Sequence, residues 1–189
     1  AASDVYKRQL GTLTFPKELK IIYDSVRSLA SETFTSVSAP IQYAAVKAYT
    51  EDHSEYLNNS RTILKKVADF VYDQLSEIGI ECIRPQGGFY ILCDFSKIIK
   101  HNNIINNATT LCEQVLQNTG CAMRPGNNFG REDKQLITRM ALVDFAGNKA
   151  LSFMKDNTSI KDDDFNELFP KINEGILNLK SWLKSEFLS

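Results

Sequence analysis

Apolar residues that recur three and four positions apart dominate the first part of the chain and predict helices there. The first helix is expected over residues 16–30, and a loop rich in hydroxyl side chains follows over residues 31–38. Pro40 then starts a second helix. A longer apolar stripe over residues 52–78 predicts a third helix, which Gly79 ends, because glycine is common just beyond the last helical turn.

The remainder of the chain alternates between short strand patterns and helical patterns. Strands are expected over residues 80–83, 89–95, 121–123 and 136–143, and helices over residues 108–119, 150–155 and 162–187. The segment 124–134 is expected to be a loop, and Pro170 and Gly175 are expected to bend or split the last helix. This order of elements predicts an α/β fold in which helices cover a short sheet.

Composition and charge narrow the classes of partner. The chain has 189 residues, of which 43% are hydrophobic and 24% charged, and its formal net charge is −1. This balance is typical of a globular protein, and the charges form no basic stripe that would indicate a nucleic-acid or membrane partner. No apolar run reaches the roughly 18 residues that span a bilayer. We therefore expect a cytoplasmic protein that binds neither nucleic acid nor membrane.

Residue types that often bind metals or act as nucleophiles are sparse and scattered. The cysteine spacings fit no zinc pattern, and we expect reduced cysteines, which are Cys82, Cys93, Cys112 and Cys121. The two histidines, His53 and His101, are expected at the surface, and the acidic run at residues 162–164 is expected to be a helix start. No metal site is expected.

The first nine residues resemble the translation of a transposase adapter that is used to prepare sequencing libraries. Segments of such origin are left out of fold reasoning. We therefore expect the sequence of the protein itself to start at Leu10, and the sequence upstream of it to be missing.

Four short motifs follow one another between residues 10 and 145. They are LGTLTFP at residues 10–16, TSVSAPIQ at 35–42, RPQGGFY at 84–90, and PGNNFG at 125–130 with RMA at 139–141. Each motif alone is weak, but together, in this order and spacing, they resemble the C-terminal part of the class I and II aminotransferases. The resemblance implies the fold-type I architecture, namely the end of a large domain followed by a small α/β domain whose short sheet is covered by helices. It also implies pyridoxal 5'-phosphate as cofactor.

The first motif bears on the catalytic lysine. In the family this motif ends a signature that contains the lysine bound to the cofactor and an arginine that holds the cofactor phosphate. Gly11 matches the last glycine of the signature, which puts the family lysine at about Ala1 and the family arginine at Gln9, where this sequence has neither. We therefore assign no catalytic and no cofactor-binding residue to this chain, and we expect the chain alone to be inactive.

The last two motifs imply substrate-binding residues. Arg139 matches the family arginine that binds the α-carboxylate of the amino acid, and a planar, permanently charged guanidinium suits that task. The alternative is a strand arginine that faces solvent. Phe89 matches an aromatic residue beside the substrate pocket, and the alternative is a buried strand aromatic. Arg124 and Arg131, on either side of the glycine loop, are expected to be mostly exposed.

The second motif and the long helix bear on the dimer interface and on the domain boundaries. In the family a similar serine and threonine loop lies at the dimer interface, whereas Ser38 as a helix N-cap explains the same residues without a partner. We expect residues 1–9 to be adapter, residues 10–50 to be the tail of the large cofactor-binding domain, and residues 51–189 to be the small C-terminal domain, entered by the long helix.

The function that the resemblance implies is amino transfer. Such enzymes of amino acid metabolism and biosynthesis move an amino group between an amino acid and a 2-oxo acid in two half-reactions, and homodimers are usual. One alternative is a ligand-sensing aminotransferase-like domain of a transcriptional regulator, which a DNA-binding segment upstream would favour. Another is a free-standing α/β interaction module, which cooperative folding of residues 10–189 would favour.

Overall fold

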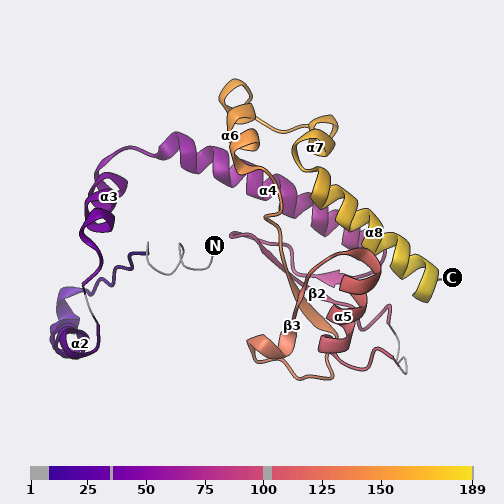
Figure 1. Ribbon diagram of the computed structural model, residues 1–189, viewed down its shortest axis with the longest axis horizontal. Coiled ribbons are helices and arrows are strands. Elements are labelled where there is room, and N and C mark those ends of the chain that lie inside the picture. Colours follow the sequence, from indigo (N-terminus) through magenta and orange to yellow (C-terminus); the bar gives the residue numbers. More distant parts are fainter. Residues whose placement is uncertain (1–8, 35, 100–103, 189) are drawn as a thin grey trace. The chain divides into compact units, whose positions relative to one another are not determined.

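The computed structural model describes residues 9–34, 36–99 and 104–188, and the chain forms two compact units, Ala1–Ser54 and Glu55–Ser189 (Figure 1). Thr35, His101 and the position matched to the catalytic lysine lie outside the described residues. The assignment of residues 10–50 to a large domain and of residues 51–189 to a small one stays a prediction.

The first unit is helical. A short 3-10 helix, η1 (Lys17–Leu19), leads into α2 (Lys20–Thr33), and α3 (Ala39–Thr50) follows, so both predicted helices are confirmed. The loop predicted to begin at Ser31 is wrong for its first three residues. The reason is that the main-chain N–H of Phe34 still donates to the oxygen of Ala30, at 2.9 Å, while the hydroxyls of Ser31 and Thr33 donate to main-chain oxygens one turn back, at 2.7 Å each, and do not compete with the helix.

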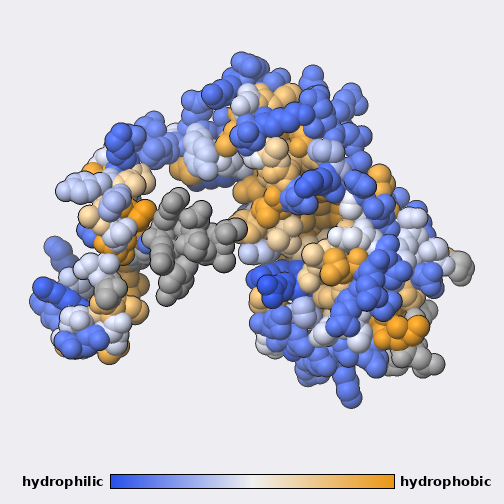
Figure 2. Space-filling view, in the orientation of Figure 1, coloured by the Kyte–Doolittle hydropathy of each residue, from blue (hydrophilic) through white to orange (hydrophobic). Residues whose placement is uncertain are grey.

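The described part of the first unit has no buried residue. Large apolar side chains of α2 and α3 are exposed instead, and Figure 2 shows apolar patches on the surface of these helices. They include Ile21, Leu29, Tyr43, Val46 and Tyr49. Residues 9–34 and 36–54 therefore build no apolar core of their own.

The second unit contains a four-stranded antiparallel sheet of order β1-β2-β4-β3. Its strands are β1 (Glu81–Cys82), β2 (Tyr90–Asp94), β3 (Arg124–Pro125) and β4 (Ile137–Ala141). The central strands β2 and β4 pair over their full length, with Leu92 opposite Arg139 and Cys93 opposite Thr138. The sheet is thus short, as predicted, and its two outer strands have only two residues each.

Burial alternates along the central strands, so the sheet has one covered and one open face. Ile91, Cys93, Thr138 and Met140 are buried, whereas the residues between them are exposed or half-buried. Because successive side chains of a strand point to opposite faces, Arg139 lies on the open face. Tyr90 and Leu92 share this face with it.

Helices cover the other face of the sheet. They are α4 (Ser54–Glu77), α5 (Ala108–Thr119) and α8 (Pro170–Phe187), while α6 (Gly147–Asp156) and α7 (Asp162–Leu168) follow the sheet in the chain and add buried side chains to the same core. The buried side chains of α4, α5 and α8 form one apolar cluster with those of β2 and β4. The helices α4 and α8 lie side by side (Figure 1), and the Lys180 ammonium of α8 bonds to Gln74 at 2.7 Å and to Glu77 at 2.9 Å on α4.

Four phenylalanine rings tie α4 and α7 to the loop after β4. The Phe165 ring stacks on Phe70 with centroids 4.0 Å apart, and it contacts Phe169 at 4.9 Å. Phe169, which lies between α7 and α8, also meets Phe145 edge-on at 5.0 Å and is 0% exposed. These rings make the break between α7 and α8 a central part of the core.

The sequence-based boundaries are confirmed for most elements, and the exceptions have physical causes. The strand predicted over residues 121–123 is wrong, because the pairing with β4 starts only at Arg124. The loop predicted over residues 124–134 also contains a 3-10 helix, η2 (Gly126–Phe129). The last helix splits before Pro170, as predicted, since proline offers no N–H to continue α7, while Gly175 lies within α8 unbroken.

No helix among the described residues is long and apolar enough to span a membrane.

Candidate functional site

Arg139 lies on the open face of the sheet against two aromatic rings. Its guanidinium carbon is 4.0 Å from the centroid of the Tyr90 ring and 3.8 Å from that of Phe129. Such cation–π contacts restrict a guanidinium without using its N–H donors. No carboxylate or carbonyl among residues 9–34, 36–99 and 104–188 accepts a hydrogen bond from Arg139. The group is therefore held in place with its donors free for a ligand.

The sheet register explains how these rings reach Arg139. Tyr90 on β2 is opposite Ala141, two positions beyond Arg139 on β4, so Tyr90 and Arg139 are diagonal neighbours on one face. Phe129 comes from η2, the short helix between β3 and β4. Gly130 ends that helix with a φ of 78°, a conformation that glycine adopts readily.

Gly126 fixes the loop that presents Phe129. It is buried, and a Cβ atom there would lie 2.8 Å from the main-chain oxygen of Ile137 and 3.2 Å from Cβ of Arg131. The start of η2 therefore packs directly on the start of β4. Only a residue without a side chain allows this close approach.

Replacing Gly126 by alanine is expected to destabilise the second unit by about 1–3 kcal/mol, because the added methyl meets backbone that cannot move cheaply. The matched control is Gly147→Ala, because an added Cβ at Gly147 has no heavy atom within 4 Å and alanine favours the helix that begins there. Chemical denaturation of the full chain measures both variants. Equal midpoints would show that the close approach at Gly126 is unimportant.

Phe89 lies just before β2 and is 38% exposed, so it is not the buried strand aromatic of the alternative interpretation. Its ring contacts that of Tyr90, with centroids 4.4 Å apart. The rings that contact Arg139 are those of Tyr90 and Phe129, which sequence reasoning did not single out. Tyr90 belongs to the motif at residues 84–90, and Phe129 belongs to the motif at residues 125–130. The motifs could therefore have indicated both residues.

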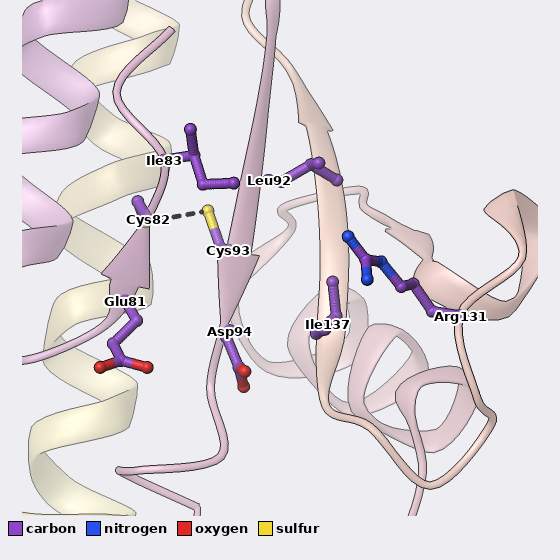
Figure 3. Close-up of a pocket in the computed structure, with 8 residues that line it drawn as sticks. All are labelled: Glu81, Cys82, Ile83, Leu92, Cys93, Asp94, Arg131 and Ile137. Carbon is purple, nitrogen blue, oxygen red and sulfur yellow. Dashed lines mark hydrogen bonds between the residues drawn. The ribbon is translucent and has the colours of Figure 1, made fainter.

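Arg124 and Arg131 are exposed, as predicted. Arg124 is directly opposite Arg139 in the pairing of β3 with β4. The Arg131 side chain reaches toward Leu92 and Ile137 over a shallow hollow beside β2 (Figure 3). Neither forms an ion pair with a carboxylate of the described residues. Glu81 and Asp94 also line this hollow, but neither pairs with Arg131, and guanidinium groups outside ion pairs favour an anionic ligand.

His53 and the possible metal ligands among the described residues offer little chemistry. His53 is half-buried in the first unit, where Nε2 lies 3.4 Å from the main-chain oxygen of Lys47. Within the described part of the chain, no three histidine, cysteine, aspartate or glutamate side chains gather so that they could hold a metal ion. Arg139 and its two rings are thus the strongest candidate site.

Comparison with known proteins was made at three levels. Residues 10–146 match the family model described as "Aminotransferase class I and II". A "Probable aspartate/prephenate aminotransferase" of Aquifex aeolicus is 28% identical over 124 residues, which cover 65% of this chain and 30% of the relative. A "1-aminocyclopropane-1-carboxylate synthase 6" of Oryza sativa subsp. japonica is 32% identical over 97 residues, 50% of this chain and 18% of the relative.

Solved structures give the same picture at the level of the fold. An aminotransferase from Mycobacterium tuberculosis superposes with a TM-score of 0.62 at 22% identity, over 91% of this chain and 36% of that one. The chain thus spans about a third or less of the length of these proteins.

Proposed function

We propose that this chain, which belongs to the class I and II aminotransferases, is the part of an amino-transferring enzyme that binds the carboxylate of the amino-acid substrate. The observation that supports this most is Arg139, a half-buried guanidinium held against two rings with its hydrogen-bond donors unused. A carboxylate is the natural ligand for such a group, because its two oxygens match two parallel N–H donors.

Each residue of the site has a part in this proposal. Arg139 binds the substrate carboxylate in two parallel bonds and so orients the α-carbon toward the reacting groups of the whole enzyme. The Tyr90 and Phe129 rings restrict the guanidinium before substrate arrives, which reduces the entropy lost on binding. Arg124 and Arg131 raise the local concentration of anionic substrate. Phe89, beside Tyr90, is proposed to line the side-chain end of the pocket.

The described residues do not themselves form a site for pyridoxal phosphate, the cofactor on which this family depends and which serves as an electron sink. Gln9, exposed, stands where the resemblance places the phosphate-binding arginine, and a neutral amide has neither the positive charge nor the bidentate fork of an arginine. We therefore derive no step through the cofactor, and we propose that the chain alone is inactive.

The whole enzyme is proposed to act on an amino acid and a 2-oxo acid, as a homodimer, in the cytoplasm. The exposed apolar side chains of α2 and α3 support a larger assembly, since surfaces of this kind are usually covered by other parts of a protein or by a partner. A transcriptional regulator has no support among the relatives named above.

The test is an amino-transfer assay of the 189-residue chain and of the longer gene product that contains residues 10–189. With pyridoxal phosphate, amino acids and a 2-oxo acid, the longer protein is expected to release a new amino acid, whereas the chain alone is not. After borohydride reduction, peptide mass spectrometry should find no single lysine of the chain labelled by the cofactor. A longer protein that makes 1-aminocyclopropane-1-carboxylate, or binds amino acids without turnover, would contradict amino transfer.

A further inference from the structure

Cys82 and Cys93 face each other at the outer edge of the sheet. They are directly opposite in the pairing of β1 with β2, and their sulfur atoms lie 3.2 Å apart (Figure 3). Both cysteines are free thiols. The pair lies on the covered face of the sheet, whereas Arg139 lies on the open face, so the two features are independent.

The backbone at this pair already suits a covalent link. The main-chain N–H of Ile83 donates to the oxygen of Leu92 at 3.4 Å, so the neighbouring pair is the hydrogen-bonded one. Cys82 and Cys93 therefore form a non-hydrogen-bonded pair, for which Cα atoms are about 4.5 Å apart. Disulfides bridge Cα distances of about 4.4–6.8 Å, so a bond needs no separation or shift of the strands.

The two thiols differ in their access to solvent, and the surroundings of Cys93 disfavour its thiolate. Cys82 is half-buried on the edge strand, whereas Cys93 on the inner strand is 1% exposed. The hydrogen bond with Cys82 and burial raise the pKa of Cys93 well above its ordinary value. Cys93 therefore keeps its proton, and Cys82 is the sulfur that an oxidant reaches first because it is the more accessible of the two.

We propose that Cys82 and Cys93 are a site of reversible oxidation, at which a hydroperoxide converts the two thiols into a disulfide. The Cys82 thiolate attacks one peroxide oxygen, so an S–O bond forms, the O–O bond breaks, and the leaving oxygen is protonated to water or an alcohol. The Cys93 sulfur then attacks the sulfenic sulfur of Cys82, an S–S bond forms, and a second water leaves with the Cys93 proton. The two thiols lose two electrons, and the peroxide gains them.

The bond would fasten the two-residue edge strand to the centre of the sheet. The chain between the cysteines bends at residues 86–89 and leads into Tyr90. A disulfide would close this segment into a loop and restrict its opening. Oxidation is therefore expected to slow main-chain hydrogen exchange of Ile83 and Leu92, whose hydrogen bond lies beside the cross-link.

The experiment treats the full native chain with hydrogen peroxide, blocks the remaining thiols by alkylation, and digests it without reduction for mass spectrometry. The Cys82–Cys93 linked peptide is expected to exceed any other cysteine pair by at least about tenfold, and a dithiol reductant should remove it. Cys121 is the internal control, because it is also half-buried but contacts the main-chain oxygen of Gly175, at 3.1 Å, rather than a thiol. In denaturant the preference should disappear.

Two variants separate the roles of the sulfurs. In Cys93→Ala, Cys82 is expected to accumulate sulfenic acid that a 1,3-dicarbonyl probe traps, whereas in Cys82→Ser the buried Cys93 should stay reduced. The linked-peptide measurement on the native chain tests the proposal even if a variant fails to fold. The proposal is wrong if peroxide leaves Cys82 and Cys93 separately alkylated, or if Cys121 is oxidised as fast as Cys82.

Discussion

Arg139→Ala is expected to lower kcat/KM for amino acids by about a hundredfold or more in the enzyme that contains this chain, mainly by raising KM. Two hydrogen bonds from a charged donor to a carboxylate are worth about 3 kcal/mol or more together, and alanine removes both. Since the lost bonds also orient the α-carbon, kcat should fall as well. Steady-state kinetics with several amino donors measures the effect.

Two control variants separate the effect of the paired guanidinium donors of Arg139 from the effect of positive charge alone. Arg139→Lys keeps the charge but loses the parallel donors, so its kcat/KM should lie between those of the wild type and the alanine variant. Arg124→Ala removes an exposed charge directly opposite Arg139, and its smaller effect should fade as salt is added. Unchanged kinetics for Arg139→Ala would show that the carboxylate binds elsewhere.

Phe169→Ala is expected to lower the free energy of unfolding of the second unit by about 3–5 kcal/mol, because a fully buried ring is lost and a cavity remains. The ring contacts both Phe145 and Phe165, so its loss loosens the junction of α7 and α8 together with the loop after β4. Urea denaturation of the full chain, followed by circular dichroism, gives the change in midpoint.

Leu177→Ala is the matched control, since this leucine lies on α8 but is 50% exposed. Its effect should stay below about 1 kcal/mol, because surface changes seldom cost more. A Phe169 variant as stable as the Leu177 variant would mean that the four rings are not a central part of the core.

Local patterns were sufficient to predict most elements of the fold. Gly79 has a positive φ of 87° and follows α4, as its position after an apolar stripe predicted, and Gly120 ends α5 with a φ of 75°. The end of α2 was missed because the hydroxyls of Ser31 and Thr33 bond back into the helix, which composition alone does not reveal. The strand β3 was misplaced because its position depends on a partner strand far away in the sequence.

The candidate site was also predictable only in part, because its residues are brought together by pairing between strands that are far apart in the sequence. The motif at residues 125–141 singled out Arg139, but the contact with Tyr90 follows from the register of β2 against β4, about 50 positions apart. The pair Cys82 and Cys93 was equally hidden, because a sequence spacing of 11 gives no sign that two strands place them opposite each other. Long-range pairing therefore decides which residues meet, and local periodicity decides only which face each one occupies.

The alternation of faces along β4 has a consequence for how the sheet assembles. If β4 slipped by one residue against β2, Arg139 would turn into the apolar layer beneath the helices, while Thr138 and Met140 would turn outward. Burying an unpaired guanidinium costs several kcal/mol, so such misregistered states are strongly disfavoured. The charge that we assign to recognition thus also acts during folding, where it selects one strand alignment over its nearest competitors.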